Sequence, residues 1–106
     1  MEKQFHRAMA KIYEEAKKEG YTASYFLRML SEHGGVETAR RLVNSDTPSE
    51  GFTRLWMMKR LDLSVESLIL KSEWKSLFDD EERERARVRL EKYGVVVNND
   101  KTGDTP

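Results

Sequence analysis

Two histidines are the first residues to consider for chemistry, because imidazole binds metals and transfers protons near neutral pH. They are His6 and His33, and Glu32 and Glu37 lie close to His33 in sequence. These residues lack the spacing of a metal motif such as HExxH, and the chain has no cysteine to complete a Cys-His site. A histidine at a helix C-terminus complements the helix dipole, which is explanation enough for His33. We therefore expect no metal and no cofactor.

Serine and carboxylate side chains also lack a catalytic arrangement. None of the eight serines lies in a G-x-S-x-G elbow, which exposes a serine nucleophile in hydrolases. Five carboxylates crowd the six positions from 79 to 84, but at a predicted helix start they complement the positive end of the dipole. Gly34 and Gly35 lack the spacing of a phosphate-binding loop. We expect no catalytic residue and no enzyme activity.

Basic side chains offer a binding function instead. Arg85, Arg89 and Lys92 are spaced to form one stripe of the last predicted helix, and further basic residues crowd the middle of the chain around Lys59. If both groups shared a face, they would form a phosphate-binding footprint. The predicted nucleic-acid contacts are Arg40, Arg41, Arg54, Arg60, Arg85, Arg89 and Lys92. Because 19 basic residues balance 19 acidic ones, long-range attraction to a polyanion is weak, so nucleic-acid binding is the alternative function.

The first expectation is a protein-interaction or regulatory module, and it rests on Trp56, Met57 and Met58. Three consecutive helical residues span about 200°, so these side chains cannot all point into one core. At least one is predicted to be exposed, and methionine suits protein contacts because it is flexible and polarisable. Met57 and Met58 are therefore the predicted protein-contact residues.

Helical periodicity dominates the sequence. A face such as Phe5, Met9, Tyr13 and Ala16 predicts an amphipathic first helix that ends before Gly20. Helices are predicted over 2–19, 22–33, 36–43, 47–60, a short one from 64, a turn or two over 72–78, and a last one over 79–92. Predicted N-caps are Thr22, Thr47, Ser64, Ser72 and Asp79. The central core is predicted to contain Phe52, Leu55 and Trp56 of the fourth helix. The second helix is predicted to bury one face, which consists of Ala23, Phe26, Leu27 and Leu30.

The pattern predicts an all-α fold, a compact orthogonal bundle of about six or seven short helices. A chain of 106 residues supports one core, so residues 1–97 are predicted to form a single domain. Residues 98–106 contain no apolar side chain and are predicted to be a disordered tail. No charge-free run approaches the roughly 20 residues of a membrane span, and we expect no secretory signal. Together with the absence of cysteine, the expected lack of a membrane span and of a secretory signal favours a cytoplasmic protein.

Three stretches of the chain resemble one protein family. They are HGGVETARRLV over 33–43, GFTRLW over 51–56 and RLDLSVE over 60–66, and the likeness extends over about residues 20–94. The family pattern has an acidic residue and a glycine where this chain has Met58 and Lys59, and Pro-Glu-Phe where it has residues 72–74. The resemblance implies a small helical domain, alone or appended to others, in bacteria and their mobile elements. No activity is established for that family, so no catalytic residue can be carried over.

Overall fold

The computed structural model describes residues 1–97, and within that range the fold is all-α, as predicted. The predicted tail, 98–106, lies outside the described residues. Six α-helices and two 3₁₀ helices make up the described part, which contains no strand. In chain order they are α1 (Glu2–Lys18), α2 (Ser24–His33), α3 (Gly35–Val43), α4 (Glu50–Met57), η1 (Leu61–Leu63), α5 (Val65–Ile69), η2 (Ser72–Leu77) and α6 (Asp80–Lys92). None of the described helices is both long and apolar enough to cross a bilayer.

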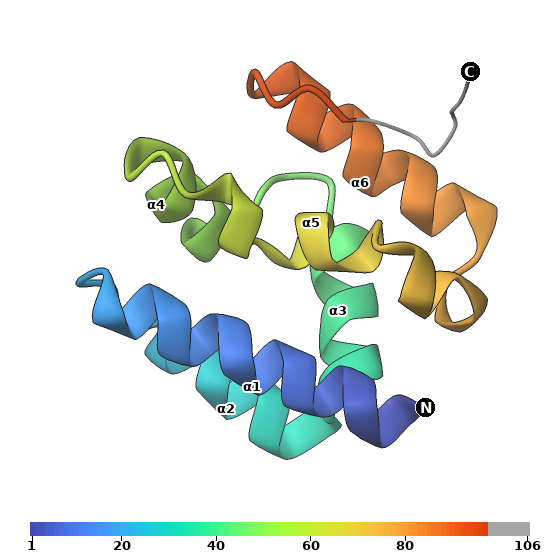
Figure 1. The fold of residues 1–106 in the computed structure, drawn as a ribbon, viewed down its shortest axis with the longest axis horizontal. Helices are drawn as coiled ribbons and strands as arrows, with labels where there is room; N and C mark the ends of the chain where they lie inside the picture. The colour runs from blue at the N-terminus through green and yellow to red at the C-terminus, as the bar shows by residue number, and fades with distance from the viewer. Residues whose placement is uncertain (98–106) are drawn as a thin grey trace.

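The helices form two layers joined by α3 (Figure 1). α1 and α2 lie side by side in one layer, and α3 packs against both of them. α5 and α6 pack against each other in the second layer, where α4 also lies, and α3 reaches both α5 and α6. The predicted orthogonal bundle is confirmed by this arrangement, because α3 crosses between layers instead of running along them.

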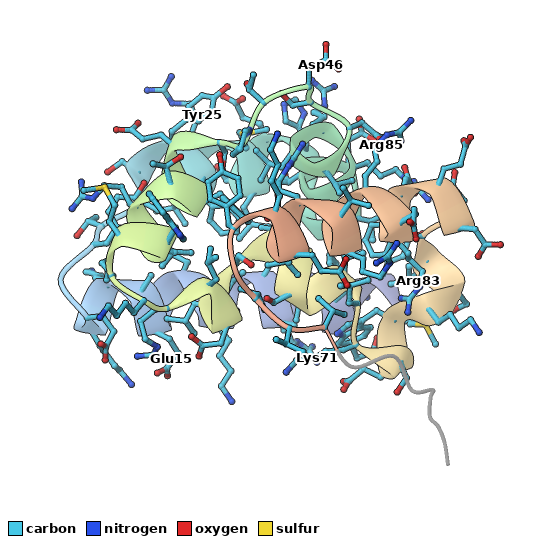
Figure 2. The ribbon with its side chains drawn as sticks, turned by 90° about the horizontal axis from the view of Figure 1, so that it is seen from above. Glu15, Tyr25, Asp46, Lys71, Arg83 and Arg85 are labelled. Atoms are coloured by element: carbon cyan, nitrogen blue, oxygen red, sulfur yellow. The ribbon has the colours of Figure 1, made fainter. Side chains whose placement is uncertain are left out.

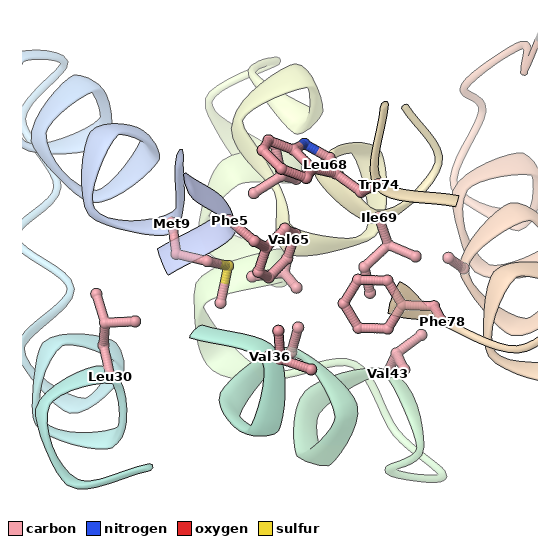
Figure 3. Packing of buried hydrophobic residues seen from close by; sticks show 12 residues of the cluster. Phe5, Met9, Leu30, Val36, Val43, Val65, Leu68, Ile69, Trp74 and Phe78 are labelled. Atoms are coloured by element: carbon pink, nitrogen blue, oxygen red, sulfur yellow. The ribbon is translucent and has the colours of Figure 1, made fainter. Parts of the chain in front are cut away.

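The main core lies between α1, α3, α5 and η2 (Figure 3). Its centre is the ring of Phe5, which meets Trp74 and Phe78 edge-on with ring centroids 5.4 and 5.1 Å away. These three rings are called the inner aromatic triad below. The predicted apolar face of α1 is confirmed, since Phe5, Met9, Tyr13 and Ala16 are all buried.

Three helices end in the same backbone arrangement. At the end of α4 the Arg60 amide donates to the Leu55 carbonyl, the long bond of a Schellman motif. The motif needs one residue in the left-handed region, and α1 and α6 supply Gly20 and Gly94 there. α4 supplies Lys59, with φ at +61°. A side chain in this conformation costs about 1 kcal/mol or more relative to glycine, so Lys59 is kept at an expense in stability.

The predicted limits of the fourth helix are wrong at both ends. Ser49 is the N-cap, and its Oγ accepts a hydrogen bond from the Phe52 amide at 3.1 Å. The predicted cap, Thr47, lies two residues upstream, outside the helix. At the other end the Schellman motif stops the helix at Met57 instead of Arg60.

The early end of α4 also overturns the prediction that Trp56 is central to the core. Phe52 and Leu55 are buried as predicted, but the Trp56 side chain is 46% exposed. Trp56 lies one residue before the helix ends, so no further turn covers it.

The predictions for the second helix need two corrections. α2 begins at Ser24 with Ala23 at the N-cap position, and no side chain caps it, so the predicted Thr22 cap is wrong. Leu27, which was predicted to be buried, is 42% exposed, and Met29 is buried instead.

The predicted caps Ser64 and Asp79 are confirmed, and Asp79 forms a complete capping box with Glu82. Ser72 makes no capping hydrogen bond.

Candidate functional site

The two histidines lie in one shallow cleft between the start of α1 and the α2–α3 junction. His6 and His33 both line it, with Glu2 and Glu37. Among residues 1–97, Glu32 alone approaches His33 closely enough for an ion pair, at 3.9 Å between Oε1 and Nε2. Among residues 1–97 no group of three or more histidine or acidic side chains is arranged to hold a metal ion.

Three of the predicted nucleic-acid contacts hold α6 against α3. Arg89 forms an ion pair with Glu66, at 2.8 Å between Nη1 and Oε2, and donates to the backbone carbonyls of Leu42 and Ser45. Arg85 donates to the Asn44 side chain from the same side of α6, which Figure 2 shows facing the loop after α3. These side chains serve the fold, and Arg89 is largely withdrawn from solvent.

Arg40 completes this junction from the α3 side. Its guanidinium donates to the Leu77 carbonyl at 2.9 Å and lies 3.6 Å from the buried carboxylate of Glu82. Arg40, Arg85 and Arg89 with their partners are called the α3–α6 clasp below.

The other predicted basic contacts are distributed over the surface and largely engaged. Arg41 pairs with Glu37, and Arg60 pairs with Glu19 and Asp62. The Arg54 guanidinium lies 4.7 Å above the ring of Tyr21, a cation–π contact. Lys92 is exposed and makes no ion pair among residues 1–97. The seven residues do not gather into one basic face free of acidic partners.

The predicted protein-contact residues lie at the exposed end of α4. Met57 is 66% exposed, whereas Met58 is half-buried against a second cluster of buried residues that includes Phe52, Leu55 and Leu90. Trp56 meets Tyr93 of α6's C-terminal end edge-on, at 5.4 Å between ring centroids. Trp56, Met57, Met58 and Tyr93 are called the α4 patch below.

The charges next to the α4 patch are unbalanced. Lys59 directly follows Met58 in sequence, after α4 has ended, and Lys92 directly precedes Tyr93. Both lysines are exposed. The carboxylates nearest in sequence are already paired, Asp62 with Arg60 and Glu91 with Arg87. The patch therefore combines exposed apolar surface with two cations that form no ion pair within residues 1–97.

A half-open apolar groove lies between α1, α2, α4 and the start of α5. Its volume is about 540 Å³. Most of its wall is apolar or aromatic, and hydroxyl groups of the loop between α3 and α4 lie at its edge. Its main apolar lining is Ile12, Tyr13, Phe26, Met29, Phe52 and Leu55. This cavity is called the central groove below.

Glu66 is one of the residues that line the groove, and it is 2% exposed. Burial raises the pKa of the Glu66 carboxyl, and the hydrogen bond from Arg89 opposes that rise. Tyr21 lines the same groove, and burial raises the pKa of its hydroxyl, an effect to which the Glu50 carboxylate adds. Two groups with raised pKa values thus share one apolar cavity, an arrangement found at ligand sites.

Sequence reasoning missed Glu66 and the central groove. Glu66 occupies an ordinary helical position after the Ser64 cap, and acidic residues in a first turn are common on surfaces. Its burial follows from Arg89, which lies 23 residues further along the chain. The one local signal was the apolar context, since Val65, Leu68 and Ile69 leave little of this short helix facing water.

No family model, curated protein or solved structure matches this chain.

Proposed function

We propose that this chain is a protein-interaction module of bacterial or mobile-element origin that acts in the cytoplasm without catalysing a reaction. The observation that supports it is the α4 patch, where Trp56 and Met57 are exposed side by side. Tryptophan and methionine are enriched where protein interfaces are buried, because they desolvate large surfaces. The absence of cysteine is consistent with a reducing compartment.

The charges around the patch define the partner's chemistry. Lys59 and Lys92 complement a partner that places acidic side chains beside its apolar anchors. Lys59 supports this further, because it occupies a left-handed position where glycine would be more stable. A contact between the Lys59 charge and the partner explains why a lysine occupies this position despite its cost in stability.

Nucleic acid is the alternative ligand for an aromatic surface flanked by lysines. The α3–α6 clasp weighs against it, because Arg40, Arg85 and Arg89 are engaged within the fold. The balanced net charge weighs against it as well.

Site-specific photo-crosslinking tests the proposal. A benzophenone amino acid replaces Met57 in the full chain, expressed in its native host, and the same amino acid replaces exposed Lys75 of η2 as the control. We expect position 57 to yield a protein adduct and position 75 to yield none. The adduct should map by mass spectrometry to a segment that places Asp or Glu next to apolar residues. Equal adducts from both positions, none from position 57, or adducts removed by nuclease would refute the proposal.

A second variant separates function from folding. Lys59→Gly removes the strained conformation and should raise the free energy of unfolding by about 1 kcal/mol. The same change should lower the yield of adduct at position 57 several-fold. A more stable protein with unchanged adduct yield would show that the lysine charge does not take part in binding.

A further inference from the structure

The central groove is an apolar cavity that the proposed function leaves unused. Small-molecule sites have volumes of about 300–1,000 Å³ and mostly apolar walls, and the groove matches both properties at about 540 Å³. Neither Trp56 nor Met57 lines it, so the groove and the α4 patch are separate sites.

The charges around the groove exclude most ionic ligands. An anion would face Glu66 at the wall and Glu50 at the rim. A cation would find Glu66 already neutralised by Arg89, and would lose its hydration against apolar side chains. Arg41, the basic residue in the lining, is paired with Glu37. The favoured ligand is therefore neutral.

Glu66 determines the polar group that such a ligand needs. Its Oε2 accepts from Arg89, and within residues 1–97 no other side chain donates to Oε1. Glu66 is one of the residues that line the groove, so a ligand inside lies against this residue. A hydrogen bond to a charged acceptor that is buried from water is stronger than one in water, so a ligand with a hydrogen-bond donor is selected.

The side chains that line the groove determine the apolar part of the ligand. Aromatic rings from three helices line the groove, among them Tyr13, Phe26 and Phe52. Rings such as these pack edge-on or offset against another ring. We propose that the central groove binds a small neutral aromatic molecule with one hydrogen-bond donor, which contacts these rings and donates to the Glu66 carboxylate.

A matched pair of probes tests this in the unmodified protein. Indole carries an N–H donor, and 1-methylindole has the same ring with the donor removed. The ε-methyl NMR signal of Met29 reports on the groove, and that of exposed Met57 serves as the control. We expect saturable shifts of the Met29 signal with both probes and an affinity about tenfold higher for indole, because the donor meets a charged acceptor. Equal affinities, or shifts that do not saturate at Met29, would overturn the proposal.

Variants locate the site. Gly51 lies at the groove, and a methyl group added to it would have the Tyr21 hydroxyl as its nearest neighbour at 3.7 Å, so Gly51→Ala fits and Gly51→Leu extends into the cavity. Indole binding should survive Gly51→Ala and be lost in Gly51→Leu. Glu66→Gln should reduce the preference for indole over 1-methylindole to about twofold, since a neutral acceptor binds the donor less strongly. An unchanged preference in Glu66→Gln, or indole binding retained in Gly51→Leu, would contradict the assignment. The crosslinking at position 57 is independent of these results.

Discussion

Two aromatic triads with the same local geometry have different surroundings in this protein. The inner aromatic triad joins Phe5 to Trp74 and Phe78, and a second triad joins Tyr93 to Phe52 and Trp56, with edge-on contacts in both. Trp74 is 7% exposed in the first, whereas half of Trp56 faces solvent in the second. Ring geometry alone therefore does not reveal which tryptophan holds the fold together. The surrounding helices decide that, since α1, α3, α5 and η2 close over one triad and α4 ends beside the other.

The largest expected effect is at the centre of the inner triad. Phe5 is fully buried and contacts both other rings. Phe5→Ala should lower the free energy of unfolding by about 3–5 kcal/mol, because it removes a large buried ring and leaves a cavity. Urea unfolding followed by circular dichroism measures this. A loss below about 1 kcal/mol would mean that the inner triad does not support the core.

Gly35 and Gly51 allow a second comparison, of how tightly the backbone is packed in two places. A methyl group on Gly35 would lie 2.7 Å from the His6 Cα, so α1 and α3 would have to separate. Gly35→Ala should cost about 1–3 kcal/mol, as overpacking does. Gly51 on the groove side has ordinary space, and Gly51→Ala should instead add up to about 1 kcal/mol through helix propensity. Thermal unfolding of both variants shows whether each change stabilises or destabilises the protein. If both changes had the same sign, the backbone around Gly35 and around Gly51 would be packed alike.

The half-exposed tryptophan should matter less for stability than its size suggests. Trp56→Ala should cost no more than about 2 kcal/mol, because about half of the ring is already in water. The same variant should reduce crosslinking from position 57. If urea unfolding showed a loss comparable to that of Phe5→Ala, the two triads would be equivalent and the contrast would fail.

The smallest effect concerns the start of α4, which places Trp56 at the surface. Ser49→Ala should lose about 1 kcal/mol because the Phe52 amide loses its acceptor. Thr47→Ala is the matched control and should leave the urea midpoint unchanged. A larger loss in Thr47→Ala than in Ser49→Ala would restore Thr47 as the N-cap that the sequence predicts.

The sequence predicted the features that depend on short-range patterns. The buried face of α1 and the caps at Ser64 and Asp79 follow from helical spacing and from hydroxyl or carboxyl groups at helix starts. Thr47 and Ser49 are both good caps two residues apart, and local sequence does not distinguish them.

Features that depend on contacts between distant segments were missed. Periodicity placed Arg85 and Arg89 on one stripe of α6, and the spacing is correct. It could not show that Asn44 and Glu66 would form hydrogen bonds with this stripe. Glu66 was missed as a groove residue for the same reason, because its partner lies on another helix.

The α3–α6 clasp has a consequence for the order of folding. Its bonds from Arg85 and Arg89 to the end of α3 and the following loop join residues 41 to 47 positions apart, so a long loop must close before they form. Contacts between α2 and α3 and between α5 and α6 join segments that lie closer in the chain, so we expect them to form first. We therefore expect the clasp to close late, when these two pairs of helices come together. Interactions that form after the transition state slow unfolding without speeding folding, so a late clasp would lengthen the lifetime of the native state.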